Sequence, residues 1–376
     1  MNRTRIITAA ALTLTAAGLL LAGPLTPPAG PVTSTYKTLT EVEPRIAINL
    51  TNTPGDANSL FKITQPGSYY LTGNITGVAG RHGVEIAASG VTLDLMGFDL
   101  SGIPGMGAFD GVSATANSLI NITVRNGSVR AWGDDGVDLG SNFVENSAVI
   151  DVRASGNAGS GITTDDGCTI SGCSAFQNSG SGISASTGCT ISNSTAYDNT
   201  DNGISAGDGC TITGCTANSN TGNGISSGGG STITGCSASF NTGSGISASF
   251  GSTISNCTVR ANALDGIVVT SQCLVLANTC SGNGNGGDGA GIHATGADNR
   301  IEGNNCINAD RGIDVDVAGN IIIKNTCSGN TFNWSIAIGN SFGPIVVAGT
   351  NAAVVNTNSA VAGNLGSTDP NANFSY

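Results

Sequence analysis

Hydrophobic and polar residues alternate along the chain in short segments such as GISA and CTIT, which are separated by glycine and asparagine. Alternation with a period of two is typical of strands that have one buried and one exposed face. The segments recur at a fixed interval, because Gly-Ile returns every 21 residues from Gly161 to Gly266. Gly-Ile or Gly-Val marks five further units, at Gly83, Gly111, Gly136, Gly291 and Gly312. The pattern therefore predicts about eleven units of short strands.

Two other positions stay in phase with this glycine. An Ile or Val follows it by nine residues and an Asn follows it by seventeen, each in six successive units. The asparagines are Asn178, Asn199, Asn220, Asn241, Asn262 and Asn283. A unit of 21 residues is too short for two helices and a turn, and Gly, Ser, Thr and Asn are poor helix formers. We therefore expect stacked coils, each with two or three strands, paired in parallel at about 4.8 Å per coil.

The repeating pattern GIxAxxGCTIxxCxAxxN resembles the right-handed parallel β-helix of the pectate-lyase-like superfamily. Its asparagine column is similar to the turn ladder of that fold, in which stacked side-chain amides bond to one another. The resemblance covers about residues 83–340. It implies an all-β solenoid of about eleven coils with N- and C-terminal caps, similar to carbohydrate-binding and sugar-hydrolysing β-helices. Function has to be argued from a site, because one fold serves many functions.

The segments outside the repeat predict an exported protein. Arg3 and Arg5 precede an uncharged apolar run, followed by small residues and prolines, which is typical of a secretory signal peptide. An uncleaved anchor is the alternative, because the run nears the length that spans a bilayer. We expect a secreted or cell-surface protein with no membrane contact after cleavage. The expected parts are a signal peptide (1–29), an N-terminal cap (36–80), the β-helix (81–340) and a C-terminal cap or tail (341–376) that folds over the last coil.

Composition favours a lattice of small residues over a core of large ones. Glycine accounts for 57 of 376 residues and aromatic residues for 5%. Charged residues are only 10%, which argues against a disordered chain. The net charge of −12 argues against a nucleic-acid partner.

The eleven cysteines fall mainly in two columns in which serine replaces cysteine in single units. Such replacement would leave a disulfide partner unpaired, so we expect these cysteines to act as small buried side chains. Disulfides between neighbouring coils are the alternative in an exported protein. A zinc site is not expected, because the chain has only His82 and His293 and no four-ligand cluster.

Charged residues gather where the repeat is broken, and first in the N-terminal half. The segment WGDDGVD at Trp132–Asp138 loosely resembles the aspartate-rich strand of β-helix hydrolases, but it lacks their His and their Asn-Thr-Asp context. Stacked carboxylates repel one another, and a bound calcium ion or one raised pKa would relieve this. An acidic, solvated rim without chemistry is the alternative. The candidate catalytic residues are Asp135, Asp138, Asp110 and His82, and the candidate substrate-binding residues are Glu85, Trp132, Asp165 and Asp166.

A second candidate cluster lies near the C-terminal end of the repeat, at Asp265, His293, Arg311, Asp314 and Asp316. Arg311 is expected either to take part in a site or simply to pair with the acids. The function predicted for the whole chain is binding of extracellular or cell-surface polysaccharide. The alternatives are a polysaccharide lyase or glycoside hydrolase that uses the N-terminal aspartates, and a structural surface protein or ice-binding protein with outward Thr and Ser columns.

Overall fold

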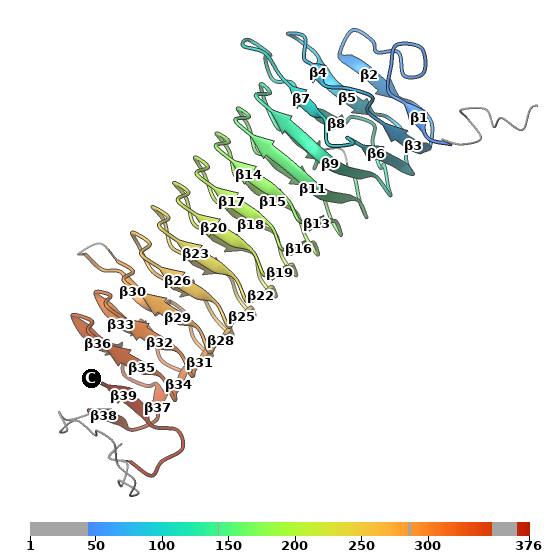
Figure 1. Cartoon of the computed structure of the whole chain (residues 1–376). Coiled ribbons are helices and arrows are strands. Elements are labelled where there is room, and N and C mark those ends of the chain that lie inside the picture. The colour runs from blue at the N-terminus through green and yellow to red at the C-terminus, as the bar shows by residue number, and fades with distance from the viewer. Residues whose placement is uncertain (1–43, 142, 285–286, 348–366) are drawn as a thin grey trace, which may run out of the picture. The chain divides into compact units, whose positions relative to one another are not determined.

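Short parallel strands stack coil upon coil in the described part of residues 45–376 (Figure 1). The structure is a computed structural model that describes residues 44–141, 143–284, 287–347 and 367–376. These residues form 39 strands and no helix. The described part of the chain accordingly offers no helix long and apolar enough to cross a membrane. The expected signal peptide, residues 1–29, lies outside the described residues.

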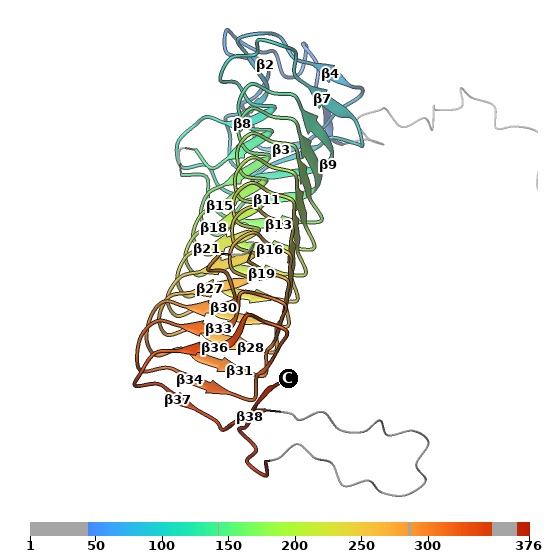
Figure 2. The same ribbon diagram turned by 90° about the vertical axis from the view of Figure 1, so that its left-hand side faces the viewer.

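Two sheets wrap the stack, and each regular coil contributes one strand to sheet B and two strands to sheet A. Figure 2 shows the strands of sheet B following one another along one side of the stack. The 13 strands of sheet B are β2 (Ser59–Ile63), β5 (His82–Ile86), β8 (Val112–Ala114), β10 (Val137–Leu139), β12 (Ile162–Thr164), β15 (Ile183–Ala185), β18 (Ile204–Ala206), β21 (Ile225–Ser227), β24 (Ile246–Ala248), β27 (Ile267–Val269), β30 (Ala290–Ala294), β33 (Arg311–Val315) and β36 (Phe332–Ile336).

Sheet A has 26 strands. They are β1 (Ile46–Ala47), β3 (Gly67–Tyr70), β4 (Ile75–Thr76), β6 (Val91–Asp94), β7 (Asp99–Ser101), β9 (Thr123–Arg130), β11 (Ala148–Ser155), β13 (Thr169–Ser171), β14 (Ser174–Phe176), β16 (Thr190–Ser192), β17 (Thr195–Tyr197), β19 (Thr211–Thr213), β20 (Thr216–Asn218), β22 (Thr232–Thr234), β23 (Ser237–Ser239), β25 (Thr253–Ser255), β26 (Thr258–Arg260), β28 (Leu274–Leu276), β29 (Thr279–Ser281), β31 (Arg300–Glu302), β32 (Asn305–Ile307), β34 (Ile321–Ile323), β35 (Thr326–Ser328), β37 (Ser341–Phe342), β38 (Ile345–Val347) and β39 (Asn373–Ser375).

The predicted all-β solenoid is confirmed, but it has about 14 coils rather than eleven. Two of the missed coils carry β2 and β36, at the two ends of sheet B. The strand register aligns Leu60 with Gly83 at one end and Asn333 with Gly312 at the other. Because these coils lack the marker glycine, a search for Gly-Ile and Gly-Val passes over them.

The glycine column is required by close packing between coils. A Cβ atom on Gly203 would lie 2.5 Å from the Asn220 side-chain nitrogen and 2.7 Å from the Gly224 carbonyl oxygen. Neither atom has room to move, because both are hydrogen-bonded within the stack. The same crowding recurs at Gly182 and Gly224, which explains why the glycine keeps its phase.

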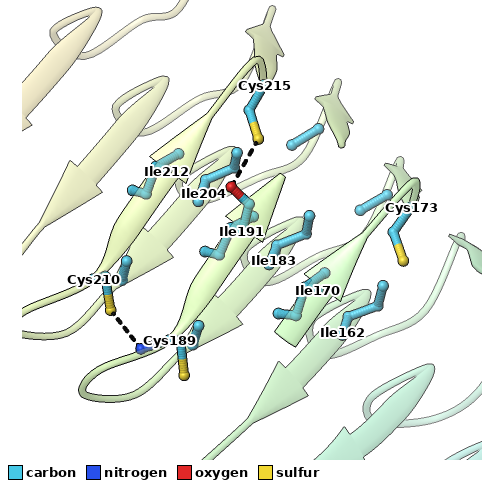
Figure 3. Packing of buried hydrophobic residues seen from close by; sticks show 14 of the residues in the cluster. Ile162, Ile170, Cys173, Ile183, Cys189, Ile191, Ile204, Cys210, Ile212 and Cys215 are labelled. Carbon is cyan, nitrogen blue, oxygen red and sulfur yellow. Dashed lines mark hydrogen bonds between the residues drawn. The ribbon is translucent and has the colours of Figure 1, made fainter. Parts of the chain in front are cut away.

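The inward side chains form a core of small and branched residues. Ile183, Ile191, Ile204 and Ile212 are fully buried and lie in two rows along the stack (Figure 3). In β18 the outward Ser205 separates Ile204 from Ala206, both of which are buried, so the alternation read from the sequence is confirmed. All eleven cysteines are buried with free thiols, which confirms their predicted role as small buried side chains.

The cysteine columns have a second function that their size alone does not indicate. The Cys189 N–H donates to the Cys210 Sγ at 3.4 Å (Figure 3), and the Cys210 N–H donates to the Ser231 Oγ at 3.2 Å. Further along the same column the Cys273 N–H donates to the Asn299 Oδ1 at 2.8 Å. Cys, Ser and Asn therefore replace one another because each supplies an acceptor to the preceding coil at a tight turn.

The asparagine column forms a continuous ladder at another turn. Asn199 donates its side-chain N–H to the Asn220 Oδ1 at 2.9 Å, and the same oxygen accepts the Asn199 backbone N–H at 3.0 Å. A second ladder continues from Cys257 through Asn278, Asn304 and Asn325. It ends in β39, which pairs with β35 and β38, where Asn373 accepts a side-chain hydrogen bond from Asn325. Buried polar groups of this kind are stable because every donor finds an acceptor.

Candidate functional site

Two columns of sheet B bring the charged residues together: the position just before the glycine and the outward position two residues after it. At the N-terminal end they hold His82, Asp110, Asp135 and Asp138, which together with the adjacent Asp134 we call the N-terminal acid cluster. At the C-terminal end they hold Asp265, His293, Arg311 and Asp314, and Asp316 follows. These five residues are called the C-terminal histidine cluster.

In the N-terminal acid cluster the residues before the glycine bond to the backbone of the next coil. The His82 Nδ1 accepts the Asp110 N–H at 3.0 Å, and the Asp110 Oδ1 accepts the Asp135 N–H at 3.0 Å. The Asp135 Oδ1 in turn accepts the Ser160 N–H at 2.6 Å. Asn202 has the same role in the central coils, where its Oδ1 accepts the Asn223 N–H. Three of the four predicted catalytic residues therefore have a structural hydrogen-bonding role.

The carboxyl groups of this cluster are partly withdrawn from water. Burial raises the pKa of Asp135 to about 6, although hydrogen bonds from the Thr163 hydroxyl and the Ser160 N–H oppose the shift. Burial also raises the pKa of Asp134 and of Asp138. Asp138 lies in the middle of β10 and accepts hydrogen bonds from the Gly140 N–H and the Ser141 hydroxyl.

Glu85 is buried beside the N-terminal acid cluster and forms an ion pair that the sequence did not reveal. The Lys62 Nζ lies 2.8 Å from the Glu85 Oε1 and 2.8 Å from the Asp56 Oδ2. Burial opposes ionisation of Glu85, but hydrogen bonds from Lys62, Thr115 and Ser59 outweigh it and lower the pKa of this carboxyl group. Lys62 lies in β2, in one of the coils that the glycine pattern missed.

The other predicted binding residues lie elsewhere. Trp132 is 1% exposed, and its indole N–H donates to the Leu100 carbonyl oxygen at 3.1 Å. Its ring lies against Gly83 in the interior, away from the outer surface of the stack. Asp165 and Asp166 follow β12, whereas Asp135 lies before β10, so the two groups lie at opposite ends of neighbouring strands.

The C-terminal histidine cluster is held by direct contacts between side chains. The His293 Nδ1 lies 3.2 Å from the Asp265 Oδ2, and its Nε2 lies 3.1 Å from the Asp316 Oδ2. The Arg311 guanidinium donates to the Asp314 Oδ2 at 2.6 Å and also contacts Asp288. The hydrogen bond with Asp265, reinforced by Asp316, raises the pKa of His293 to about 9 despite partial burial.

A cavity of about 510 Å³ opens beside this cluster, with Leu264, Asp265, Asp288 and His293 in its wall. Asp288 belongs to the insertion that lengthens one repeat to 25 residues. The sequence pattern identified this segment only as a loop. The break that it makes in a strict repeat was nevertheless a signal of a candidate site at this position. A neighbouring cavity of about 320 Å³ includes Phe240 and shares Ala263 with the first.

Comparisons with known proteins identify the fold. The A-module of a mannuronan C-5 epimerase, AlgE6 of Azotobacter vinelandii, has a TM-score of 0.55 and 16% identity, over 83% of this chain and 91% of that one. A double mutant of the periplasmic alginate epimerase AlgG has a TM-score of 0.51 and 11% identity, over 75% and 79%. The pre-mature gene product 12 of bacteriophage phi29 has a TM-score of 0.51 and 13% identity, over 72% and 49%.

Identities this low establish the fold alone. The search of curated protein sequences gave no match. The family described as the right handed beta helix region matches residues 74–238 and 205–360, which together are more than half of the chain. The chain therefore belongs to the right-handed β-helix family.

Proposed function

We propose that this is an exported β-helix protein that binds an extracellular or cell-surface polysaccharide along the outward face of sheet B. One observation carries the proposal: a row of partly exposed hydroxyl side chains leads along this face toward the cavity at the C-terminal histidine cluster. The row consists of Thr163, Ser184, Ser205, Ser226 and Ser247, which are aligned by the strand register.

The row offers one hydroxyl group per coil, at a spacing of about 4.8 Å. Small side chains leave the face open, and each hydroxyl both donates and accepts hydrogen bonds, as a sugar hydroxyl requires. The cavity adds an apolar wall at Leu264, whose side chain is 55% exposed, beside the polar Asp265 and His293. An apolar wall with a few placed polar groups is typical of a small-molecule site and suits a sugar ring.

The fold comparison supports the choice of ligand class. Two structural neighbours are, by their names, a mannuronan C-5 epimerase and an alginate epimerase, so the same fold elsewhere serves proteins that act on polysaccharides. One of them is named as periplasmic, in agreement with the proposed export of this chain. The signal peptide at residues 1–29 is part of this proposal.

A binding screen tests the proposal. The purified chain is passed over immobilised neutral, anionic and cationic polysaccharides, and we expect retention on at least one of them. Leu264→Arg, which fills the cavity, should weaken retention about tenfold, a change of about 1.4 kcal/mol. Phe143→Arg is the matched control, because Phe143 is a similarly exposed apolar residue on the loop after β10. If the wild-type chain is retained on none of the polymers, the binding function is wrong and a structural surface role becomes the better explanation.

A second candidate function is cleavage of the polysaccharide at the N-terminal acid cluster. The observation that favours it is the pKa of Asp135 near 6, which would let this carboxyl group give or take a proton close to neutral pH. The test monitors reducing ends and the absorbance of unsaturated sugars, with and without EDTA to remove calcium. Asp135→Asn keeps the acceptor for the Ser160 N–H, so cleavage that persists in this variant and in Asp138→Ala would exclude the cluster as the catalytic site.

A further inference from the structure

Two strands of sheet B place one imidazole and two carboxylates around a common point. Asp314 in β33 and Asp316 directly after it are two residues apart, so their side chains project from the same face. The strand register places His293 beside Asp314. One ligand atom from each residue lies within 4.8 Å of the other two. We propose that His293, Asp314 and Asp316 bind a divalent transition-metal ion.

The separations between the ligand atoms are suitable for a single ion. Nitrogen and oxygen ligands lie about 2.0–2.2 Å from a zinc ion, so two ligands of one ion are about 3–3.5 Å apart. The His293 Nε2 and the Asp316 Oδ2 are already 3.1 Å apart, and the Asp314 Oδ2 lies 3.9 Å from the same nitrogen. The Asp316 side chain is 48% exposed, which leaves it free to move toward Asp314.

His293 and Asp314, the less exposed of the three proposed ligands, are each held in place by a second side chain. The Asp265 Oδ2 bonds to the His293 Nδ1 at 3.2 Å, which directs the Nε2 toward the two carboxylates. The Asp265 Oδ1 accepts the Ala290 N–H at 2.7 Å, so this aspartate is itself fixed. Arg311 holds the Asp314 carboxylate at 2.6 Å. Carboxylate support of a ligating histidine is the usual arrangement around metal ions in proteins.

Charge and ligand type select the class of ion. The carboxylates of Asp265, Asp314 and Asp316, together with the Arg311 guanidinium and a neutral imidazole, carry a net charge of −2, which a divalent cation balances. The imidazole ligand favours Fe²⁺ or Zn²⁺ over Ca²⁺ or Mg²⁺, which prefer oxygen ligands alone, and the two carboxylates also suit Mn²⁺. Binding releases the proton that the His293 Nε2 otherwise shares with Asp316, and the nitrogen lone pair then binds the ion.

Manganese is the appropriate probe, because the chain holds eleven thiols that would compete for zinc but have little affinity for Mn²⁺. The full chain is treated with EDTA and desalted, and free Mn²⁺ is then followed by electron paramagnetic resonance during a titration. We expect one Mn²⁺ per chain. His293→Gln should weaken binding about tenfold or more, and Asp265→Asn should weaken it by about 10- to 100-fold through the orientation of the imidazole.

His82→Gln is the matched control, because His82 is the other histidine of the chain and lies in the N-terminal acid cluster. It should bind Mn²⁺ like the wild type. Asp316→Asn provides a second variant at a half-exposed side chain, and circular dichroism checks that every variant is folded. The proposal is wrong if the wild-type chain binds no Mn²⁺, if His293→Gln binds it as tightly as the wild type, or if Ca²⁺ displaces it at equal concentration.

Discussion

The N-terminal acid cluster and the C-terminal histidine cluster are built on the same two columns of sheet B, yet their carboxylates are balanced differently. In the N-terminal cluster Asp135 is held by an N–H and a hydroxyl group, and burial raises its pKa. In the C-terminal cluster the imidazole of His293 and the guanidinium of Arg311 meet the acids directly. The position in the coil thus sets the backbone hydrogen bond. Whether the acid has a cation depends on nearby side chains, from the same strand for Arg311 and from the next coil for His293.

The largest expected effect comes from removing the guanidinium of the C-terminal histidine cluster. Arg311→Met leaves the Asp314 carboxylate, which is 3% exposed, without its closest cation. The Arg311 side chain is itself 32% exposed, but the carboxylate left behind is buried, and a buried charged group without its partner costs about 3 kcal/mol. We therefore expect the free energy of unfolding in urea to fall by about 3 kcal/mol.

Arg260→Met is the control for this prediction, because the Arg260 side chain lies on the surface of β26 near the ring of Phe240. It should change the free energy of unfolding by less than about 0.5 kcal/mol. Equal losses in both variants would mean that Asp314 is not specifically stabilised by Arg311.

The second prediction concerns pH and the N-terminal acid cluster. Because the folded-state pKa of Asp135 lies at about 6, above the ordinary value of 3.8, the folded chain holds this proton more tightly than the unfolded chain. Stability should therefore fall as pH rises from about 4 to about 7, by about 3 kcal/mol if the shift is fully expressed. Asp135→Asn, which carries no titrating proton, should flatten this dependence and raise the stability at neutral pH.

The measurement is urea unfolding of wild-type and variant chains at several pH values. Asp198→Asn serves as the control, because Asp198 is an exposed aspartate in a turn of the central coils. A wild-type chain whose stability rises across the same window, with no difference from Asp135→Asn, would show that Asp135 is not held in its protonated form.

The third prediction applies the same substitution to the matching position of the C-terminal histidine cluster. Asp265→Asn keeps an oxygen for the Ala290 N–H, as Asn202 and Asn223 do in their coils, but removes the charge that faces His293. We expect a loss of about 1 kcal/mol at neutral pH, because hydrogen bonds to charged groups exceed neutral ones by about this amount. An increase in stability, as predicted for Asp135→Asn, would show that His293 does not stabilise the Asp265 carboxylate and that the two clusters do not differ in this respect.

The smallest effect on stability is expected between the two clusters. Replacing Ser184, Ser205 and Ser226 together by Ala removes three outward hydroxyls without opening a cavity. The free energy of unfolding should change by less than about 0.5 kcal/mol per site. Retention on the polysaccharide should nevertheless weaken, because the hydroxyl row is the proposed binding face. Unchanged retention would confine binding to the cavity beside His293.

The sequence predicts the regular part of the fold because each coil repeats the same physical requirement. Crowding at Gly203 allows no Cβ, Ile204 and Ile212 fill the interior, and Asn220 closes the turn. Such columns are visible in a single sequence, because every unit has the same residue types at the same positions. The two end coils are not detected by this pattern, because Leu60 and Asn333 replace the glycine at positions where few neighbouring atoms crowd the backbone.

The candidate sites were less predictable, because several of their contacts involve residues outside the two charged columns. The pairing of Lys62 with Glu85 depends on a coil that the pattern missed. Trp132 stands next to the predicted aspartates in the sequence, but its side chain turns inward and donates to Leu100. Asp288 reaches the cavity from an insertion, whose length gives no information on where its side chains point.

Because the coils are uniform, the number of coils between the two clusters fixes the distance between them. Seven strand-to-strand steps separate Asp138 from His293, which amounts to about 34 Å along the stack at about 4.8 Å per step. Loss of one 21-residue unit, such as residues 203–223, would bring the two clusters about 5 Å closer and leave every turn ladder in phase. The spacing between two charged sites on one chain can therefore change in discrete increments, through unequal recombination within the repeat and without redesign of either site.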